Sequence, residues 1–304
     1  MKMPEPFISI VIPTYNRAQF LKANIPRLCA LDYENYEIVV VDDGSTDDTP
    51  LVMADLSHER LRVFRKENGE RAAARNYGAK QAIGDYITFL DSDDILYDDA
   101  LQKAAEAIIE KKFPFFLHLA YDIGTPDKIS KTVIRLKDNN PYILVKGNPL
   151  SCMGVFIRRE VFQSHQFNED RNLSASEDWE FWMRLAAFYG LRTDNRIVGR
   201  LIEHKTRSVV TASEEKLVMR KTLAIRYAFE DETVRTVFGK YKRSIAAYWD
   251  TYIALHLVID GLKSRALYYF LGGIRKDIGC LFTRRALVII KFLLQKRNEE
   301  DELN

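Results

Sequence analysis

The sequence contains few cysteines and shows no strong excess of either charge. Its 304 residues include only three cysteines, Cys29, Cys152 and Cys280, which stand far apart and form no CxxC pair. A sparse, odd count argues against a structural zinc site and fits a reducing cytosol. Lys and Arg total 45 against 43 Asp and Glu, a net charge of +2. We therefore expect no nucleic acid partner, because such proteins usually carry a basic excess.

Long apolar runs are also missing. No stretch reaches the roughly 18 apolar residues that a membrane-spanning helix requires, and the apolar run Phe7–Ile12 is too short for a signal peptide. We predict a cytoplasmic protein that spans no membrane, although this leaves open a peripheral position at the inner face of the cell membrane.

Four common catalytic motifs do not occur. The sequence has no GxGxxG after a strand, no GxxxxGK[ST], no HExxH and no GxSxG. Their absence argues against a dinucleotide oxidoreductase, a P-loop NTPase, a zincin and an α/β-hydrolase.

What is present in the first half is a regular alternation of short buried strands and helices. Apolar runs at residues 7–12, 37–41, 61–64 and 85–90 predict strands, and the segments between them predict helices. This order predicts an α/β fold, a Rossmann-like, mostly parallel sheet flanked by helices. Ligands of such sheets bind beyond the carboxyl ends of the strands.

Acidic side chains follow the strand at residues 85–90. Asp91 and Asp93 stand at positions i and i+2 and would point the same way if the backbone stays extended, with Asp94 turned elsewhere. Such carboxylates suit Mg²⁺ or Mn²⁺, which take oxygen ligands. The alternative is a solvated acidic turn that caps the following helix.

Polar residues follow two other strands. Asp42 and Asp43 end the second strand. They either cap the next turn, or one of the carboxylates accepts a hydrogen bond from the imide N–H of a pyrimidine. Tyr15 ends the first strand and could pack against the same base. Arg75 is either a surface cation or a ligand of a diphosphate, which a guanidinium matches well.

Two later positions allow a structural and a functional interpretation. Glu177 and Asp178 open an aromatic-rich helix, where acidic residues favour the helix dipole. His204 ends a strand, and a lone histidine is usually structural.

Together, the residues described above and the segments around them resemble a family 2 glycosyltransferase of the bacterial polysaccharide type. The resemblance covers roughly residues 7–210 and rests on five segments in the family's order. They are ISIVIPTYNRAQFL (Ile8–Leu21), EIVVVDDGSTDDT (Glu37–Thr49), ENGERAAARNYG (Glu67–Gly78), GDYITFLDSDD (Gly84–Asp94) and SEDWEFWMRL (Ser176–Leu185). The resemblance implies a GT-A fold and an inverting, metal-assisted hexosyltransferase that uses a nucleotide sugar.

The resemblance also implies roles for individual residues. Asp178 would be the catalytic base and Glu177 would orient the acceptor. Asp93 would bind Mn²⁺ or Mg²⁺, and His204, in a looser match, would complete the metal site. The nucleotide sugar would be held by six residues: Thr14, Tyr15, Asp43, Arg75, Asp91 and Ser92.

The implied reaction is transfer of one sugar, with UDP as the expected nucleotide, to a glycan or lipid-linked acceptor hydroxyl. Single transfer is expected because the QxxRW motif of processive members is missing. Two alternatives stay open: a nucleotidyltransferase that makes nucleotide sugars, disfavoured because Pro13–Asn16 replaces a glycine-rich loop, and a non-catalytic sugar-binding or interaction domain.

The C-terminal third has no counterpart in the resemblance. We predict a catalytic domain over residues 1–210 and a helical region over residues 211–304, with long helices at Lys216–Phe229, Thr233–Ile259 and Ser264–Gln295. The apolar stretch Arg284–Arg297 has basic residues at both ends. It suits either a helix buried in a bundle or homo-oligomer interface, which is slightly favoured, or a helix lying on a membrane surface.

Overall fold

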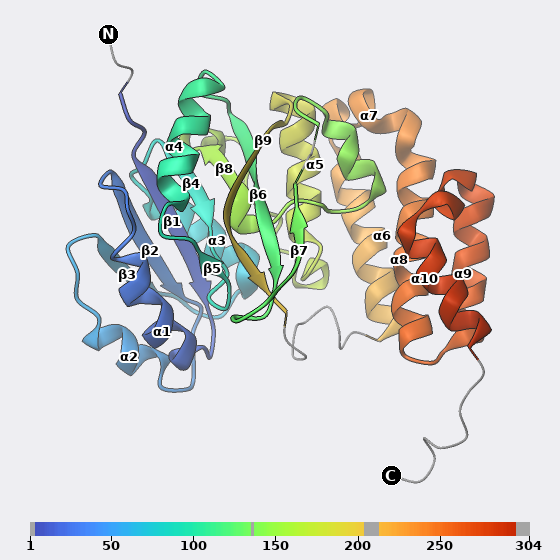
Figure 1. Ribbon diagram of the computed structural model, residues 1–304, viewed down its shortest axis with the longest axis horizontal. Coiled ribbons are helices and arrows are strands. Elements are labelled where there is room, and N and C mark those ends of the chain that lie inside the picture. Colours follow the sequence, from blue (N-terminus) through green and yellow to red (C-terminus); the bar gives the residue numbers. More distant parts are fainter. Residues whose placement is uncertain (1–3, 135–136, 204–212, 296–304) are drawn as a thin grey trace.

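The computed structural model describes residues 4–134, 137–203 and 213–295 of the chain. A twisted sheet with helices on both faces occupies one part of the molecule, and a helical bundle occupies the end opposite to the first two helices (Figure 1).

Within these residues, nine strands form one sheet in the order β3-β2-β1-β4-β8-β6-β9-β5, with β7 paired to β6. Strands β1 to β4 are mutually parallel, β6 and β9 are parallel to each other, and β5, β7 and β8 run antiparallel to their neighbours. The strands are β1 (Ile8–Thr14), β2 (Tyr36–Asp42), β3 (Leu61–Arg65), β4 (Tyr86–Phe89), β5 (Ile95–Leu96), β6 (Phe116–Gly124), β7 (Ile129–Val133), β8 (Val155–Arg158) and β9 (Arg192–Ile202).

Helices connect these strands and continue after them. The α-helices are α1 (Ala18–Leu28), α2 (Thr49–Asp55), α3 (Glu70–Gln81), α4 (Ala100–Glu110), α5 (Glu177–Tyr189), α6 (Glu214–Glu230), α7 (Glu232–Phe238), α8 (Lys242–Ile259), α9 (Lys263–Lys276) and α10 (Arg284–Leu294). Short 3₁₀ turns are η1 (Pro141–Lys146), η2 (Cys152–Gly154), η3 (Arg159–Gln163), η4 (Arg171–Leu173), η5 (Gly239–Tyr241) and η6 (Ile278–Phe282).

Alternate side chains of the central strands feed two hydrophobic cores. Ile10 and Ile12 of β1 pack with α1 and α4 on one face of the sheet, whereas Val11 packs with α3 and α5 on the other. All seven residues of β1 are buried. A strand covered on both faces reads as a continuous apolar run, which is why this part of the sequence predicts a parallel sheet correctly.

The predicted strand–helix order of the first half is confirmed, with boundaries shifted by a few residues. In the middle of the chain, the sequence predicts strands at residues 115–119, 153–157 and 196–202 and a helix at residues 176–189. They correspond to β6, β8, β9 and α5. The two-residue β5 and the edge hairpin strand β7 were not predicted, and α4 was expected only as a helix after the acidic turn, without bounds.

Two of the long C-terminal helices were predicted wrongly. The segment Thr233–Ile259 is divided into α7 and α8 by the 3₁₀ turn at Gly239, and Ser264–Gln295 is divided into α9 and α10. In the second case the 3₁₀ turn η6 separates the two helices. Asp277 caps η6 and Thr283 caps α10, because their side chains accept hydrogen bonds from the N–H groups of Gly279 and Ala286.

The C-terminal helices share a core with the sheet. Helix α6 packs against α5, and Ala224, Phe229 and Trp249 belong to the same buried cluster as Trp179 of α5. Residue 210 lies outside the described residues, and a domain boundary there stays a prediction. No helix in the described part of the chain is both long enough and apolar enough to cross a membrane.

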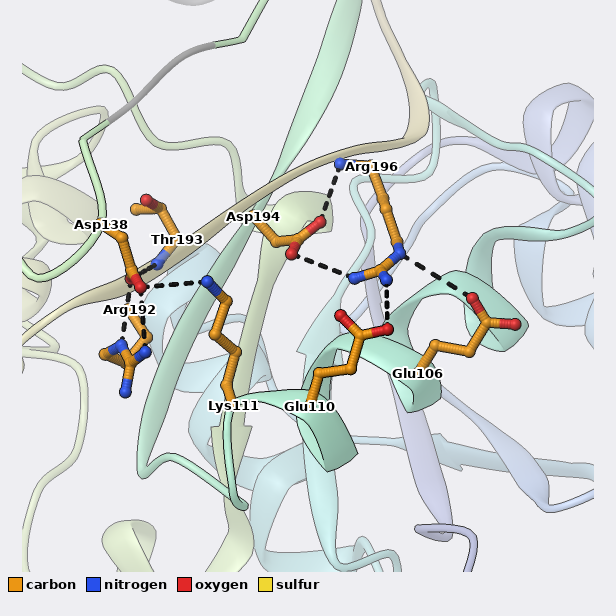
Figure 2. Close-up of polar contacts among 8 residues, drawn as sticks. All are labelled: Glu106, Glu110, Lys111, Asp138, Arg192, Thr193, Asp194 and Arg196. Atoms are coloured by element: carbon orange, nitrogen blue, oxygen red, sulfur yellow. Dashed lines mark hydrogen bonds and ion pairs between the residues drawn. The ribbon is translucent and has the colours of Figure 1, made fainter.

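Charged contacts fix β9 against α4 on one side (Figure 2). The guanidinium of Arg196 lies 3.0 Å from Asp194, 2.6 Å from Glu110 and 3.8 Å from Glu106. Because the two glutamates belong to α4, these contacts join a strand and a helix that are distant in sequence.

Asp138 makes the second contact of this kind (Figure 2). Arg192 donates two hydrogen bonds to its carboxylate at 3.0 and 2.9 Å, and Lys111 and the Thr193 N–H donate at 3.0 and 2.8 Å. Burial would raise the pKa of Asp138, but these donors outweigh it and hold the pKa well below its usual range. Both contacts stabilise β9, the strand that precedes His204 in the sequence.

Candidate active site

A cavity of about 550 Å³ opens beyond the carboxyl ends of β1, β2 and β4. The register of the sheet places Thr14 opposite Asp42, so the polar residues after these strands meet at one edge. Nine of the ten predicted site residues line this cavity; the tenth, His204, lies outside the described residues. The nine are Thr14, Tyr15, Asp43, Arg75, Asp91, Ser92, Asp93, Glu177 and Asp178.

Asp43 is held from several sides at the floor of the cavity. Its carboxylate accepts hydrogen bonds from the Gly69 N–H at 2.9 Å, the Lys66 ammonium at 2.8 Å and the Asn68 amide at 3.2 Å. Asp42 points elsewhere and caps the turn by accepting from the Ser45 N–H. Asp42 therefore has the capping role, and a contact between Asp43 and a nucleotide base stays a prediction.

The first strand ends in one buried and one exposed side chain. Tyr15 is 46% exposed, so its ring is available to a ligand in the cavity, whereas Thr14 is buried. Among the described residues, the Thr14 hydroxyl and the Nε of Arg75 have no hydrogen-bond partner. Three other buried atoms in the described ranges also have no hydrogen-bond partner, but their residues do not line the cavity: Asp42 Oδ2, His118 Nδ1 and Trp182 Nε1. Buried polar atoms are normally paired, so Thr14 and Arg75 offer two polar atoms to a ligand in the cavity.

The Asp91–Asp94 segment forms a turn, not the extended backbone assumed from the sequence. The Asp94 N–H donates to the Asp91 carbonyl at 3.0 Å, so alternation along a strand does not govern where these side chains point. Asp91 and Asp93 nevertheless line the same cavity. Asp94, which the sequence predicts to point elsewhere, lines the cavity as well. Its carboxylate accepts from the Ile202 N–H at 2.8 Å, which ties the turn to the end of β9.

Arg75 joins two carboxylates that come from opposite sides of the cavity. Its guanidinium donates to Asp91 at 2.7 Å and to Glu177 at 3.1 Å, and the side chain is only 2% exposed. Arg75 is therefore not the surface cation of the first interpretation. It fixes the turn after β4 relative to the start of α5, and a direct contact with a diphosphate stays a prediction.

Asp178 lies at the start of α5 with both carboxylate oxygens in hydrogen bonds. The Trp179 N–H donates to one at 2.7 Å and the Asn148 amide donates to the other at 2.7 Å. Burial raises the pKa of Asp178, and the neighbouring charge of Glu177 raises it further, against opposing effects of Arg75 and Lys221. A carboxylate with a raised pKa is suited to accept a proton near neutral pH.

Three residues around the cavity adopt left-handed backbone conformations that side chains disfavour. Asn16, Glu70 and Ala175 have φ values of 53°, 71° and 66°. Glu70 and Ala175 line the cavity, and Asn16 follows Tyr15 in the sequence. The other described non-glycine residues with such φ values, Lys112, Phe113 and Asn139, do not line it. Backbone strain of this kind gathers at functional sites, where surrounding structure holds it in place.

His118 supports the segment 150–154 through a hydrogen bond. It is completely buried, its Nε2 accepts a hydrogen bond from the Ser151 N–H at 3.2 Å, and burial lowers its pKa from 6.5 to about 3. The folded protein therefore keeps His118 neutral at pH values where the unfolded chain binds a proton, so stability falls as the pH falls below 6.5.

Because of this histidine, we expect the free energy of unfolding to be about 2 kcal/mol lower at pH 5 than at pH 7. His118→Gln keeps an acceptor for Ser151 and should remove that part of the pH dependence. Urea unfolding at the two pH values measures both proteins. Equal losses in wild type and variant would contradict the assignment, since every other histidine is common to both.

The cavity residues suit a divalent cation in their chemistry. The Asp93 side chain is 13% exposed, and the Arg17 guanidinium lies 3.8 Å from it. Mg²⁺ and Mn²⁺ bind one or two protein carboxylates together with water and phosphate oxygens, which Asp93 can match. In the described ranges no three His, Cys, Asp or Glu side chains are grouped to hold a metal ion.

Several contacts of the site were not predicted. Asn148, which holds Asp178, lies in a loop without a recognisable motif, and the loop at residues 66–69 closes around Asp43. Lys221 of α6 approaches the start of α5. The signal for Lys221 is present in the sequence, because it occupies a position in the apolar stripe Leu217–Lys221–Ala224–Ala228.

A comparison with protein families identifies the family of the chain. The sequence model described as glycosyl transferase family 2 matches residues 9–167, just over half of the chain. The chain belongs to glycosyltransferase family 2. The match covers β1 to β4 and the strand-end residues of the cavity, and it ends before the start of α5.

Two glycosyltransferases are similar to part of the chain. An uncharacterized glycosyltransferase of Rickettsia felis is 34% identical over 184 residues, which is 59% of this chain and 30% of that protein. The match thus spans less than a third of that relative. The Escherichia coli protein named UDP-Glc:alpha-D-GlcNAc-diphosphoundecaprenol beta-1,3-glucosyltransferase WfgD is 27% identical, covering 60% of this chain and 71% of its own.

Solved structures of glycosyltransferases share the fold. Staphylococcus aureus TarS 1-349 in complex with UDP-GlcNAc superposes with a TM-score of 0.61 at 18% identity, covering 86% of this chain and 89% of that chain. The mannosyltransferase PcManGT of Pyrobaculum calidifontis, in complex with GDP-Man and Mn²⁺, gives a TM-score of 0.59 at 17% identity over 96% and 86% of the chains. The predicted GT-A fold is confirmed.

Proposed function

We propose that this family 2 glycosyltransferase transfers a single sugar from a nucleoside diphosphate sugar, with UDP as the nucleotide, to an acceptor hydroxyl with inversion at the anomeric carbon. The observation that carries the proposal is the convergence of Asp43, Asp91, Asp93 and Asp178 on one cavity. UDP-GlcNAc in the TarS title and the UDP-Glc donor in the WfgD name support the choice of nucleotide.

The donor would lie along the strand ends. The half-exposed ring of Tyr15 would stack on the base, and the Asp43 carboxylate would accept from its imide N–H. Asp91 and Ser92 would lie beside the ribose and the donor sugar, and the unpaired Thr14 hydroxyl offers one further polar contact.

Asp178 would act as the base from the other side of the cavity. The acceptor oxygen attacks the anomeric carbon, the bond between that carbon and the diphosphate oxygen breaks, and the hydroxyl proton passes to Asp178. General-base help of this kind contributes about 10² to 10⁴ in rate. Glu177, fixed by Arg75 at 3.1 Å, would orient the acceptor and hold the start of α5 in place.

A divalent cation, Mn²⁺ or Mg²⁺, is part of the proposal. Asp93 would bind it, with His204 as the second protein ligand, and the ion would supply positive charge to the leaving diphosphate. The Mn²⁺ named in the PcManGT title supports this choice.

The acceptor is proposed to be a glycan or lipid-linked hydroxyl, in line with the diphosphoundecaprenol acceptor in the WfgD name. One face of α10 packs into the bundle through Ala286 and Ile289, while Leu287 and Leu294 are 67% and 78% exposed. The helix is thus buried on one side, and contact of its exposed side with a membrane surface or with a second copy stays a prediction.

The proposal is tested by screening nucleotide sugars for Mn²⁺-dependent thermal stabilisation and for release of the nucleotide diphosphate. A ligand present at about 100 times its Kd stabilises the folded protein by about 2.7 kcal/mol. We expect UDP-sugars to stabilise the protein and to be slowly hydrolysed. Formation of nucleotide sugars from a nucleoside triphosphate, or binding without turnover with any donor and acceptor, would contradict it.

Asp93→Ala should abolish the metal-dependent part of nucleotide diphosphate binding. The variant removes the carboxylate proposed to hold the cation, so UDP affinity should become the same with and without Mn²⁺. Calorimetry of UDP binding measures this directly. Asp98→Ala, at an exposed carboxylate outside the cavity, is the matched control; an undiminished Mn²⁺ effect in Asp93→Ala would refute the assignment.

A further inference from the structure

Lys221 is a buried lysine that has no role in the reaction proposed above. It lies on α6 and is 6% exposed, in a stripe of apolar residues that packs on α5 and α8. A lysine is almost never buried without a partner. Its ammonium donates to the Ser176 hydroxyl at 2.8 Å, and it lies 4.0 Å from the Trp249 ring centroid and 4.7 Å from that of Tyr252.

These contacts place the charge at the beginning of α5. Ser176 immediately precedes Glu177 and Asp178, and its own N–H donates to the Glu177 carboxylate at 3.0 Å. The aromatic faces of Trp249 and Tyr252 stabilise a cation and leave it otherwise dry. The ammonium therefore acts on the neighbouring carboxylates through a medium that screens it weakly.

We infer that Lys221 is a positioning residue for Asp178, which holds the start of α5 through Ser176 and supplies the positive charge that offsets the burial of the base. The inference deepens the proposed function and rests on it. It makes the C-terminal helices a functional part of the site, because α6 and α8 provide the lysine and the rings around it.

The charged and titratable groups that face Asp178 come from five elements. Glu177 of α5 opposes its ionisation, as do the groups at Cys152 and Tyr252 when charged. Arg75 and Arg71 of α3 favour ionisation, and so does Lys221. Arg75 is already bound to Asp91 and Glu177, so Lys221 is the cation whose removal changes Asp178 without breaking that link.

Lys221 itself faces Glu177, Asp178, Arg220 and Arg285, and it also acts on His256 of α8. Burial is the largest influence and lowers its pKa from 10.5 to about 8. It is therefore mostly protonated at pH 7, where its charge is available to Asp178.

The test is the pH dependence of turnover in Lys221→Met, with Lys216→Met as a control at an exposed position of the same helix. We expect the acid limb of kcat to move up by about one pH unit in Lys221→Met, with kcat about tenfold lower below that limb. The KM for the donor and the whole Lys216→Met profile should stay unchanged. ¹³C NMR of the Asp178 carboxyl, assigned with Asp178→Asn, should give the same shift without reference to turnover.

An acid limb and a carboxyl titration that stay at the wild-type position in Lys221→Met would overturn the inference. If Lys221→Met does not fold, Ser176→Ala decides the question, since it deletes only the hydroxyl that Lys221 binds: a several-fold drop in kcat at constant KM supports the inference, and an unchanged kcat overturns it. A wild-type chain that transfers no sugar would remove the proposed function, and this inference with it.

Discussion

Asp178→Asn should lower turnover at least about a hundredfold, because it removes the group proposed to take the acceptor proton. Asparagine has nearly the same shape and keeps an acceptor for the Trp179 N–H. The donor is proposed to bind along the strand ends, so calorimetry should find its affinity nearly unchanged. Any remaining turnover should also lose the acid limb that Asp178 gives to the wild-type pH profile.

The control for this substitution is Asp98→Asn at an exposed position. It makes the same chemical change away from the cavity and should leave turnover at the wild-type level. If turnover of Asp178→Asn stays within a few-fold of wild type, Asp178 is not the base. A large loss of donor affinity would instead place its carboxylate on the donor side of the cavity.

Arg75→Met should destabilise the folded protein by about 3 to 5 kcal/mol, the usual cost of removing one partner from a buried ion pair. The substitution leaves Asp91 and Glu177 buried or half-buried without the guanidinium that joins them. Turnover should fall as well, because the turn after β4 and the start of α5 lose their link. Urea unfolding measures the first effect.

Arg226→Met provides the comparison for a surface ion pair. Arg226 is 57% exposed and lies 3.7 Å from Glu230 on the same helix, and pairs of this kind contribute about 0.3 to 0.5 kcal/mol. A loss in Arg75→Met no greater than that of Arg226→Met would mean that the buried pair is not a link on which the fold depends.

The first half of the fold could be predicted because local and tertiary requirements agree there. Strands such as β2 are buried on both faces and appear as continuous apolar runs, and polar residues follow them where a parallel sheet forms its ligand site. The short β5 could not be predicted, because two residues carry no periodicity. The side chains at the start of β7 are exposed and form no apolar pattern that would predict a strand. Within the described ranges, β7 pairs with β6 alone.

The site shows the same division. Asp43, Asp91 and Asp93 follow strands and were found from their positions. The predicted extended conformation of Asp91–Asp94 was wrong. β4 ends at Phe89 and the backbone turns at Asp91–Asp94, so alternation along the strand no longer applies. Asn148 and Lys221 act through contacts between distant segments, and only the polar residue within an apolar stripe marks the second of them in the sequence.

The core that α5 shares with the C-terminal helices has a consequence for protein engineering. A chimera that takes these helices from a related enzyme would change more than its C-terminal part. In this protein, such a chimera would replace residues that pack against Trp179 of α5. Among them is Trp249, whose ring centroid lies 5.3 Å from that of Trp179. Loss of this aromatic contact would disturb α5, whose start carries the proposed base Asp178, so donor hydrolysis should be assayed first in any such hybrid.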